Sequence, residues 1–93
     1  MNEIEARSIL GQELSRYRQR SYSDLLSLVD RIETLEYASP SGVTYQIEMQ
    51  VFFDDQSRGT LHIMGAIDDG RWRAFKPLCD DFIMAPDGSF VGE

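Results

Sequence analysis

The first third of the chain has apolar residues at helical spacing. Between Glu3 and about Arg20, one stripe recurs at intervals of four, four and three, with Ile9 beside it: Ala6, Leu10, Leu14 and Tyr17. These intervals place side chains on one face, so we predict a helix that buries the stripe. Ser21 and Asp24 have capping-box spacing, which predicts a second, shorter helix over roughly Ser23 to Arg31. The pattern leaves open whether these are separate helices or one kinked rod.

In the middle of the chain the hydrophobic period changes to two. From Val43 to Phe53 the odd positions are apolar or aromatic, and the even positions are almost wholly polar. This alternation predicts a long strand with one buried face. The preceding segment IETLEYA is followed by SPSG, which has turn composition. We therefore predict a hairpin that places Leu35 and Tyr37 on the buried side.

Two more turns give the remaining strand pairings. A five-residue loop over Asp54 to Arg58 pairs Val51 with Leu61, Met49 with Ile63 and Ile47 with Gly65. Asp69-Gly70 is a favoured two-residue hairpin loop. It pairs Ile67 with Trp72, Gly65 with Ala74 and Met64 with Phe75. After Pro77, the segment DFIMA predicts a short last strand.

Gly65 and Ala74 form a small pair on the buried face of this predicted sheet. Small residues allow a helix to approach closely, and the first helix is the natural occupant. We predict a two-layer α+β fold, with one or two N-terminal helices packed on a four- to five-stranded antiparallel β-meander. The 93 residues suffice for a single domain, with a helical segment over 1–31 and a sheet over 32–93.

The net charge of −7 lies entirely in the sheet half of the chain. Residues 1–31 carry five basic and five acidic groups, whereas residues 32–93 carry four basic and eleven acidic groups. Nucleic-acid binding needs a basic surface, so this half favours a basic protein partner or solubility alone. The chain has no apolar run of membrane-spanning length, and the polar start MNEIEARS is unlike a signal peptide. The single cysteine, Cys79, makes the cytoplasm the expected location.

Three aspartate doublets stand out: Asp54-Asp55, Asp68-Asp69 and Asp80-Asp81. The predicted registers bring the first and third doublets toward the same end of the sheet. Asp54, Asp55, Asp80 and Asp81 are therefore a candidate carboxylate cluster for Ca²⁺ or Mg²⁺, or for acid/base chemistry. In the alternative, Asp54 and Asp55 cap a loop, while Asp80 and Asp81 are solvated charges at a strand edge.

Other catalytic signals are weak. Cys79 and His62 are the one thiol–imidazole combination, but the aspartates that follow Cys79 disfavour a thiolate. The sequence contains no G-x-S-x-G, glycine-rich phosphate loop, paired-cysteine zinc pattern or H-E-x-x-H. We therefore predict no catalytic residue and no cofactor.

The outward face of the predicted sheet is the candidate binding surface. An antiparallel sheet covered on one side normally has a polar outer face. Here the outward positions include five candidate contact residues: Phe52, His62, Met64, Arg73 and Phe75. An apolar patch with a polar surround is typical of a binding site. In the alternative, the C-terminal segment DFIMAPDGSFV folds over this face and covers it.

The segments SGVTYQIEMQVFFD and IDDGRWRAFKPLCDDFIMAPDGSFVGE resemble small bacterial proteins of uncharacterised function. That resemblance implies a compact helix-plus-sheet domain and carries over no catalytic residues. We expect a non-catalytic interaction protein that binds a protein partner or itself. The alternatives are a small metal-dependent or hydrolytic enzyme that uses the aspartates, and a small-ligand binder on the sheet face.

Overall fold

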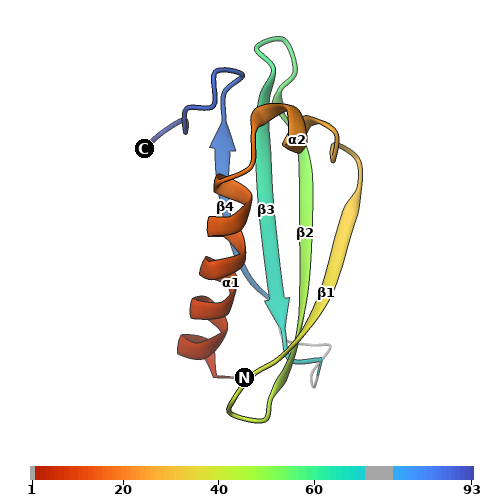
Figure 1. Ribbon diagram of the computed structural model, residues 1–93, viewed down its shortest axis with the longest axis vertical. Coiled ribbons are helices and arrows are strands. Elements are labelled where there is room, and N and C mark those ends of the chain that lie inside the picture. The colour runs from red at the N-terminus through yellow and green to blue at the C-terminus, as the bar shows by residue number, and fades with distance from the viewer. Residues whose placement is uncertain (1, 71–76) are drawn as a thin grey trace.

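The computed structural model describes residues 2–70 and 77–93, which form two layers. Its elements, in chain order, are α1 (Glu3–Arg18), α2 (Tyr22–Leu26), β1 (Ile32–Ala38), β2 (Thr44–Asp55), β3 (Thr60–Asp68) and β4 (Leu78–Met84). The strands form one antiparallel sheet in the order β1-β2-β3-β4. Helix α1 packs on one face of this sheet (Figure 1). The predicted α+β meander is confirmed, with four strands among the described residues.

Helix α1 buries the stripe that its sequence predicts. Asn2 is the N-cap, and its side chain accepts a hydrogen bond from the Glu5 N–H at 3.1 Å. The buried residues of the helix are Ala6, Ile9, Leu10, Leu14 and Tyr17. The helix ends at Arg18, two residues before the predicted end, and a turn separates it from α2. The two helices are therefore separate.

The second helix is shorter than predicted. Ser21 caps it as expected, because its hydroxyl oxygen accepts a hydrogen bond from the Asp24 N–H at 3.0 Å. The helix nevertheless ends at Leu26, not near Arg31. Downstream, the backbone bonds to the sheet instead, since the Asp30 N–H donates to the Val51 carbonyl at 3.1 Å. Asp30 has a left-handed φ of 66°, which a continuing helix excludes.

The faces of β2 and β3 are as predicted, but their pairing is shifted by two residues. Val51 lies opposite Ile63 rather than Leu61. Met49 lies opposite Gly65, and Ile47 lies opposite Ile67. The strands continue to Asp55 and Thr60, with a bulge after Phe53, so the turn is shorter than the predicted loop. An even shift keeps every side chain on its predicted face.

The predicted Asp69-Gly70 hairpin pairing is wrong. The positions opposite Ile67, Gly65 and Met64 are taken by Leu78, Asp80 and Asp81 of β4. The predicted partners Trp72, Ala74 and Phe75 lie outside the described residues. The observed register buries two large side chains in the core, Phe82 and Met84. Burying such side chains stabilises a fold by about 1.5–3 kcal/mol each, which outweighs a local turn preference.

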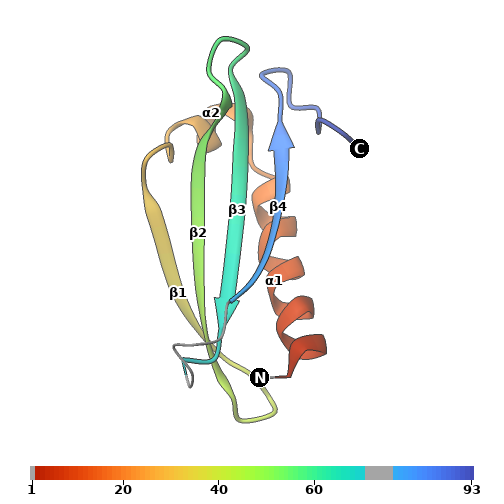
Figure 2. The same ribbon diagram turned by 180° about the vertical axis from the view of Figure 1, so that it is seen from behind.

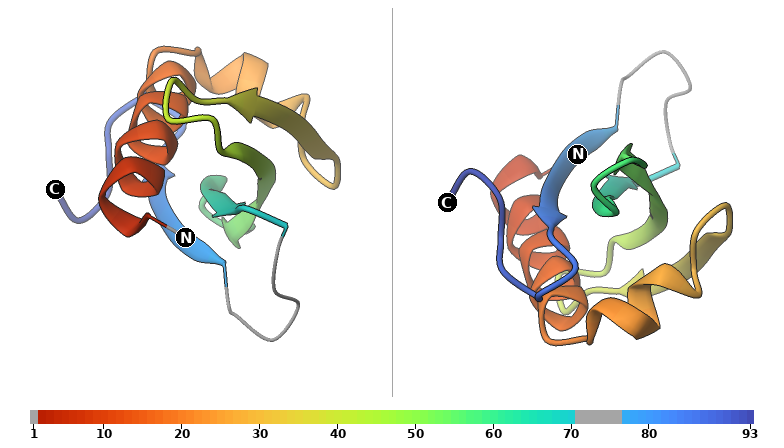
Figure 3. Two further views of the ribbon diagram at one scale, coloured as in Figure 1. Left: turned by 90° about the horizontal axis from the view of Figure 1, so that it is seen from below. Right: turned by 90° about the horizontal axis from the view of Figure 1, so that it is seen from above.

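Gly65 lets α1 approach the middle of the sheet. A Cβ atom at this position would lie 2.8 Å from Leu10 Cδ1 and 2.8 Å from Met49 Sδ. The sequence-based inference that a glycine here admits the first helix is thus confirmed. The sheet curves around the side on which α1 lies (Figure 3).

The inner side of β1 is only partly covered, because α1 packs over β3 and β4. Leu35 is half-buried against the core. Tyr37 lies opposite the fully buried Tyr45, but 36% of Tyr37 is exposed. The sequence therefore predicts the face of Tyr37 correctly and its burial wrongly, because burial depends on where the helix lies across the sheet.

We predict that Gly65→Ala lowers the free energy of unfolding by about 1–3 kcal/mol, the usual cost of overpacking a core. The new methyl group must displace Leu10 or Met49. Gly11→Ala is the matched control, because nothing lies within 4 Å of a Cβ at that helical position. Removing glycine from a helix stabilises it by up to about 1 kcal/mol. Urea titration of the three proteins measures both effects, and a Gly65→Ala protein as stable as wild type would contradict the packing argument.

Candidate functional site

Figure 2 shows the face of the sheet opposite α1, on which three of the five candidate binding residues come together. Phe52 of β2 and His62 of β3 are directly opposite each other, with ring centroids 4.7 Å apart. Met64 follows on the same face, between Gln50 of β2 and Asp81 of β4. Phe52, His62 and Met64 are each half-buried. The remaining two candidates, Arg73 and Phe75, lie outside the described residues.

Strand β4 adds outward residues that were not among the predicted contacts. Ile83 lies opposite His62 and is half-buried, so it extends the apolar surface. Asp81 reaches His62 across the sheet, with 2.5 Å between Asp81 Oδ2 and His62 Nε2. The odd–even alternation in LCDDFIM would have identified Ile83 and Asp81 as outward residues. They were missed because the predicted hairpin assigned the wrong partner to β3. We call Phe52, His62, Met64, Ala66 and Ile83 the outer strip.

The C-terminal segment does not cover the outer strip. Phe90 packs edge-on against Phe82, which points into the core, with 5.6 Å between ring centroids. The guanidinium carbon of Arg18 lies 4.7 Å from the centroids of both rings, and Arg18 also pairs with Glu93 at 2.8 Å. These contacts hold the tail beside the end of α1 (Figure 3). The alternative of a tail folded over the outer face is therefore wrong.

Carboxylates surround the outer strip. The sequences of the four strands contain eight acidic residues and no lysine or arginine. By the observed registers, four of these acids are on the outer face: Glu36, Glu48, Asp68 and Asp81. Among the described strands, His62 is the single basic group on this face. The surface thus combines half-buried apolar side chains with a negative surround.

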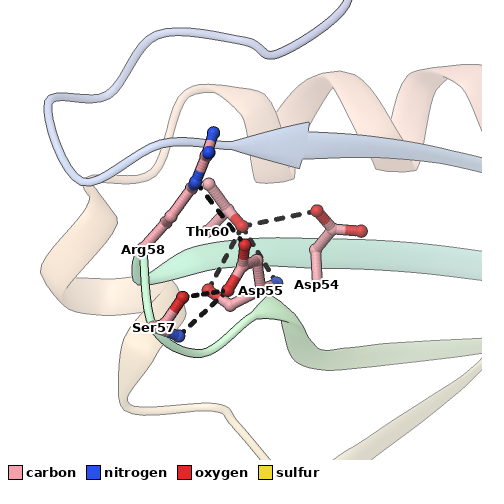
Figure 4. Close-up of polar contacts among 5 residues, drawn as sticks. All are labelled: Asp54, Asp55, Ser57, Arg58 and Thr60. Carbon is pink, nitrogen blue, oxygen red and sulfur yellow. Dashed lines mark hydrogen bonds and ion pairs between the residues drawn. The ribbon is translucent and has the colours of Figure 1, made fainter.

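The first aspartate doublet stabilises a turn (Figure 4). Asp55 Oδ1 accepts hydrogen bonds from the Ser57 N–H at 3.0 Å and the Ser57 hydroxyl at 2.6 Å. Arg58 Nε lies 3.6 Å from Asp55 Oδ2, and the Thr60 hydroxyl donates to Asp54 Oδ2 at 3.3 Å. The hydrogen bond from the Ser57 hydroxyl is the main reason why the pKa of Asp55 is lowered. The loop-capping alternative describes this doublet.

The third doublet lies elsewhere. Asp80 and Asp81 are opposite Gly65 and Met64, and as neighbours in a strand they point to opposite faces. Met64 is four residues along β3 from Thr60, which is about 13 Å at the usual rise. The four carboxylates therefore do not converge, and the described part of the chain holds no group of three or more potential metal ligands.

Cys79 and His62 are also apart. Cys79 is exposed and lies opposite Ala66, four residues along β3 from His62. Its thiol contacts the Pro77 carbonyl at 3.8 Å. The imidazole is paired with Asp81 instead, so these two side chains do not form a nucleophile–base dyad.

A separate polar cluster joins α1 to the β1–β2 turn. Glu5 Oε1 accepts hydrogen bonds from the hydroxyls of Ser39, Ser41 and Tyr45 at 3.2, 2.7 and 2.8 Å. These bonds lower the pKa of Glu5. Burial, with the bond to Glu5, raises the pKa of Tyr45 to about 12. Beside this cluster lies an open groove of about 370 Å³, lined by residues that include Ile4, Ile9 and Tyr37.

Comparisons of the chain with protein-family models, curated proteins and solved structures give no match. Within the described ranges, neither helix combines the length and apolar character that crossing a membrane requires. The function is therefore argued from the surface itself.

We predict that Asp55→Ala lowers the melting temperature, because the substitution removes the acceptor for both Ser57 hydrogen bonds. The fall in melting temperature should be the same in excess Ca²⁺, in excess Mg²⁺ and in EDTA, because Asp55 stabilises the turn through hydrogen bonds. Asp80→Ala is the control, because Asp80 is exposed and lies on another strand. A rise in wild-type melting temperature with either cation, absent in Asp55→Ala, would contradict the turn assignment.

We predict that stability falls as the pH rises from about 10 to about 12, in part because of Tyr45. Below pH 10, Tyr45 is neutral in the folded and in the unfolded state, so its contribution to the free energy of unfolding is complete. Above pH 10 the unfolded chain loses this proton first, so the unfolded state is favoured. Tyr45→Phe should cost about 1 kcal/mol at neutral pH through the lost hydrogen bond and should reduce this alkaline slope. Denaturant titrations between pH 8 and pH 11.5 measure both, and equal slopes would refute the assignment.

Proposed function

We propose that the protein is a small non-catalytic interaction domain that binds a basic protein partner through the outer face of its sheet. The observation that carries this proposal is the outer strip with its carboxylate surround. Half-buried apolar side chains provide contact area, and the carboxylates favour a partner with positive charge. A partner with a lysine- or arginine-rich surface around an apolar centre is complementary to this face.

Charge segregation supports the proposal. Arginines of the described residues lie outside the strands, and several already have acidic partners: Arg16 pairs with Glu13, and Arg20 with Glu33. The outer face has a carboxylate excess in its strands. An excess of charge of one sign speeds the association of an oppositely charged partner.

The His62–Asp81 pair stiffens the centre of this face. Packing between Phe52 and His62 and the bond from His62 to Asp81 connect β2, β3 and β4 across the outer surface. A preorganised surface loses less conformational entropy on binding. An enzymatic role has no comparable support, because the candidate carboxylates and the candidate dyad lie apart.

We predict that Met64→Lys abolishes capture of the partner. The substitution places a cation at the centre of the outer strip, where it repels a basic surface and disrupts apolar contact. Ile4→Lys is the matched control, because Ile4 is 85% exposed on α1, away from this face. Affinity capture from the native host, quantified by mass spectrometry at low and high salt, compares the three baits.

The expected result is a basic protein captured stoichiometrically by wild type and by Ile4→Lys, lost in Met64→Lys, and weakened by high salt. Capture that is equal in all three baits, or a partner that is not basic, would overturn the proposal. Circular dichroism and melting curves confirm that each bait is folded.

A further inference from the structure

The two edges of the sheet differ in their protection. At β4, Met84 forms a bridge with Phe90, and the Val91 N–H donates to the Ile83 carbonyl at 2.9 Å. At β1, no described strand lies beyond the edge. Strand β1 has no proline, lysine or bulge to prevent pairing of its edge, and its charged residues are Glu33 and Glu36. Ile32 at its start is 60% exposed.

The pairing of β1 with β2 determines which backbone groups reach this edge. The Ser39 N–H donates to the Val43 carbonyl at 2.9 Å, in register with the strand pairs that follow. Hydrogen-bonded pairs alternate along an antiparallel ladder, so Glu33, Leu35 and Tyr37 direct their backbone groups to β2. The N–H and C=O groups of four residues therefore point away from the sheet: Ile32, Thr34, Glu36 and Ala38.

We propose that two copies of the chain associate through this edge, with their β1 strands antiparallel and Leu35 on the two-fold axis. Ile32 then lies opposite Ala38 of the second copy, and Thr34 opposite its Glu36. These are the pairs whose backbone groups point outward, so each can exchange two hydrogen bonds. The result is one continuous sheet across both copies. This surface is distinct from the outer strip, and the inference does not depend on the proposed function.

Charge favours this register over the two adjacent ones. In a two-fold pairing each side chain stays on its own face of the sheet. The alternative registers therefore differ in which residue of β1 lies on the two-fold axis. Centring on Glu36 places that carboxylate opposite its own copy, and centring on Thr34 places Glu33 opposite Leu35. Centring on Leu35 places Glu33 opposite Tyr37, and Arg20 lies 3.7 Å from the Glu33 carboxylate. One repulsive contact is left, the diagonal between the two copies of Glu36.

The groove beside β1 gives this pairing apolar area. A two-fold axis perpendicular to the sheet keeps both α1 helices on the same side and places the two grooves at opposite ends of the new strand pair, each beside Glu33 of the second copy. Each contributes the exposed Ile4 and the partly exposed Tyr37. Hydrogen bonding at an edge gives affinity, and adjacent side-chain burial adds to it.

Thr34→Pro tests the inference without removing an internal hydrogen bond. The Thr34 N–H points away from β2, and proline is tolerated at such positions of edge strands. It removes two hydrogen bonds from the symmetric dimer, one in each copy. Thr34→Ala is the control, because it keeps the N–H. Light scattering over a concentration series, together with sedimentation equilibrium, gives the dissociation constant, and circular dichroism confirms the fold.

We expect a dimer for wild type and Thr34→Ala, and a dissociation constant at least about tenfold higher for Thr34→Pro. Glu36→Gln should tighten the dimer by removing the diagonal repulsion. Met64→Lys should leave the dimer intact, which separates this test from that of the outer strip. A wild-type chain that stays monomeric up to millimolar concentration would overturn the inference. So would a dimer that is unaffected by Thr34→Pro.

Discussion

The contact between Leu10 and the bare backbone at Gly65 determines how the layers meet. Because Gly65 has no side chain to hold the helix away, α1 lies close to β3. The buried stripe of α1 then fills the concave side of the sheet. Because the helix lies over β3 and β4, one helix cannot also cover β1. The open groove, the exposed part of Tyr37 and the accessible edge of β1 all follow from this position.

The same contact explains why the opposite face can serve another purpose. The core is complete with the inner side chains of the sheet, so folding does not require Phe52, Met64 or Ile83 to be apolar. An antiparallel sheet with one covered face tolerates polar residues on the other. The half-buried apolar residues on this face are the observation on which the proposed binding surface rests.

Sequence periodicity was enough to predict the helix stripe, the faces of β2 and β3, and the outward position of Phe52, His62 and Met64. These depend on local repeats of 3.6 and two residues. The partner of β3 was not predictable in this way, because the preference of Asp69-Gly70 for a tight turn competes with the burial of Phe82 and Met84. Burial is a property of the whole fold, and here it determines that β4 is the strand that pairs with β3.

The aspartate doublets illustrate the same limit. Two adjacent carboxylates look alike in a sequence whether they cap a turn, as Asp55 does, or occupy opposite faces of a strand, as Asp80 and Asp81 do. Only the positions of their neighbours along the backbone distinguish these cases. Asp68 and Asp87 accept backbone hydrogen bonds from residues two positions later, in the same manner as Asp55.

The position of α1 also affects the order in which the chain can fold. The helix is made first, yet the strands on which it packs are β3 and β4, the last two of the sheet. During synthesis, the apolar stripe of α1 cannot pack on β3 and β4 until most of the chain has been made. Contacts between such distant segments slow folding, because a long loop must close before they form. The β1–β2 hairpin, which needs no distant partner, is the element best placed to form early.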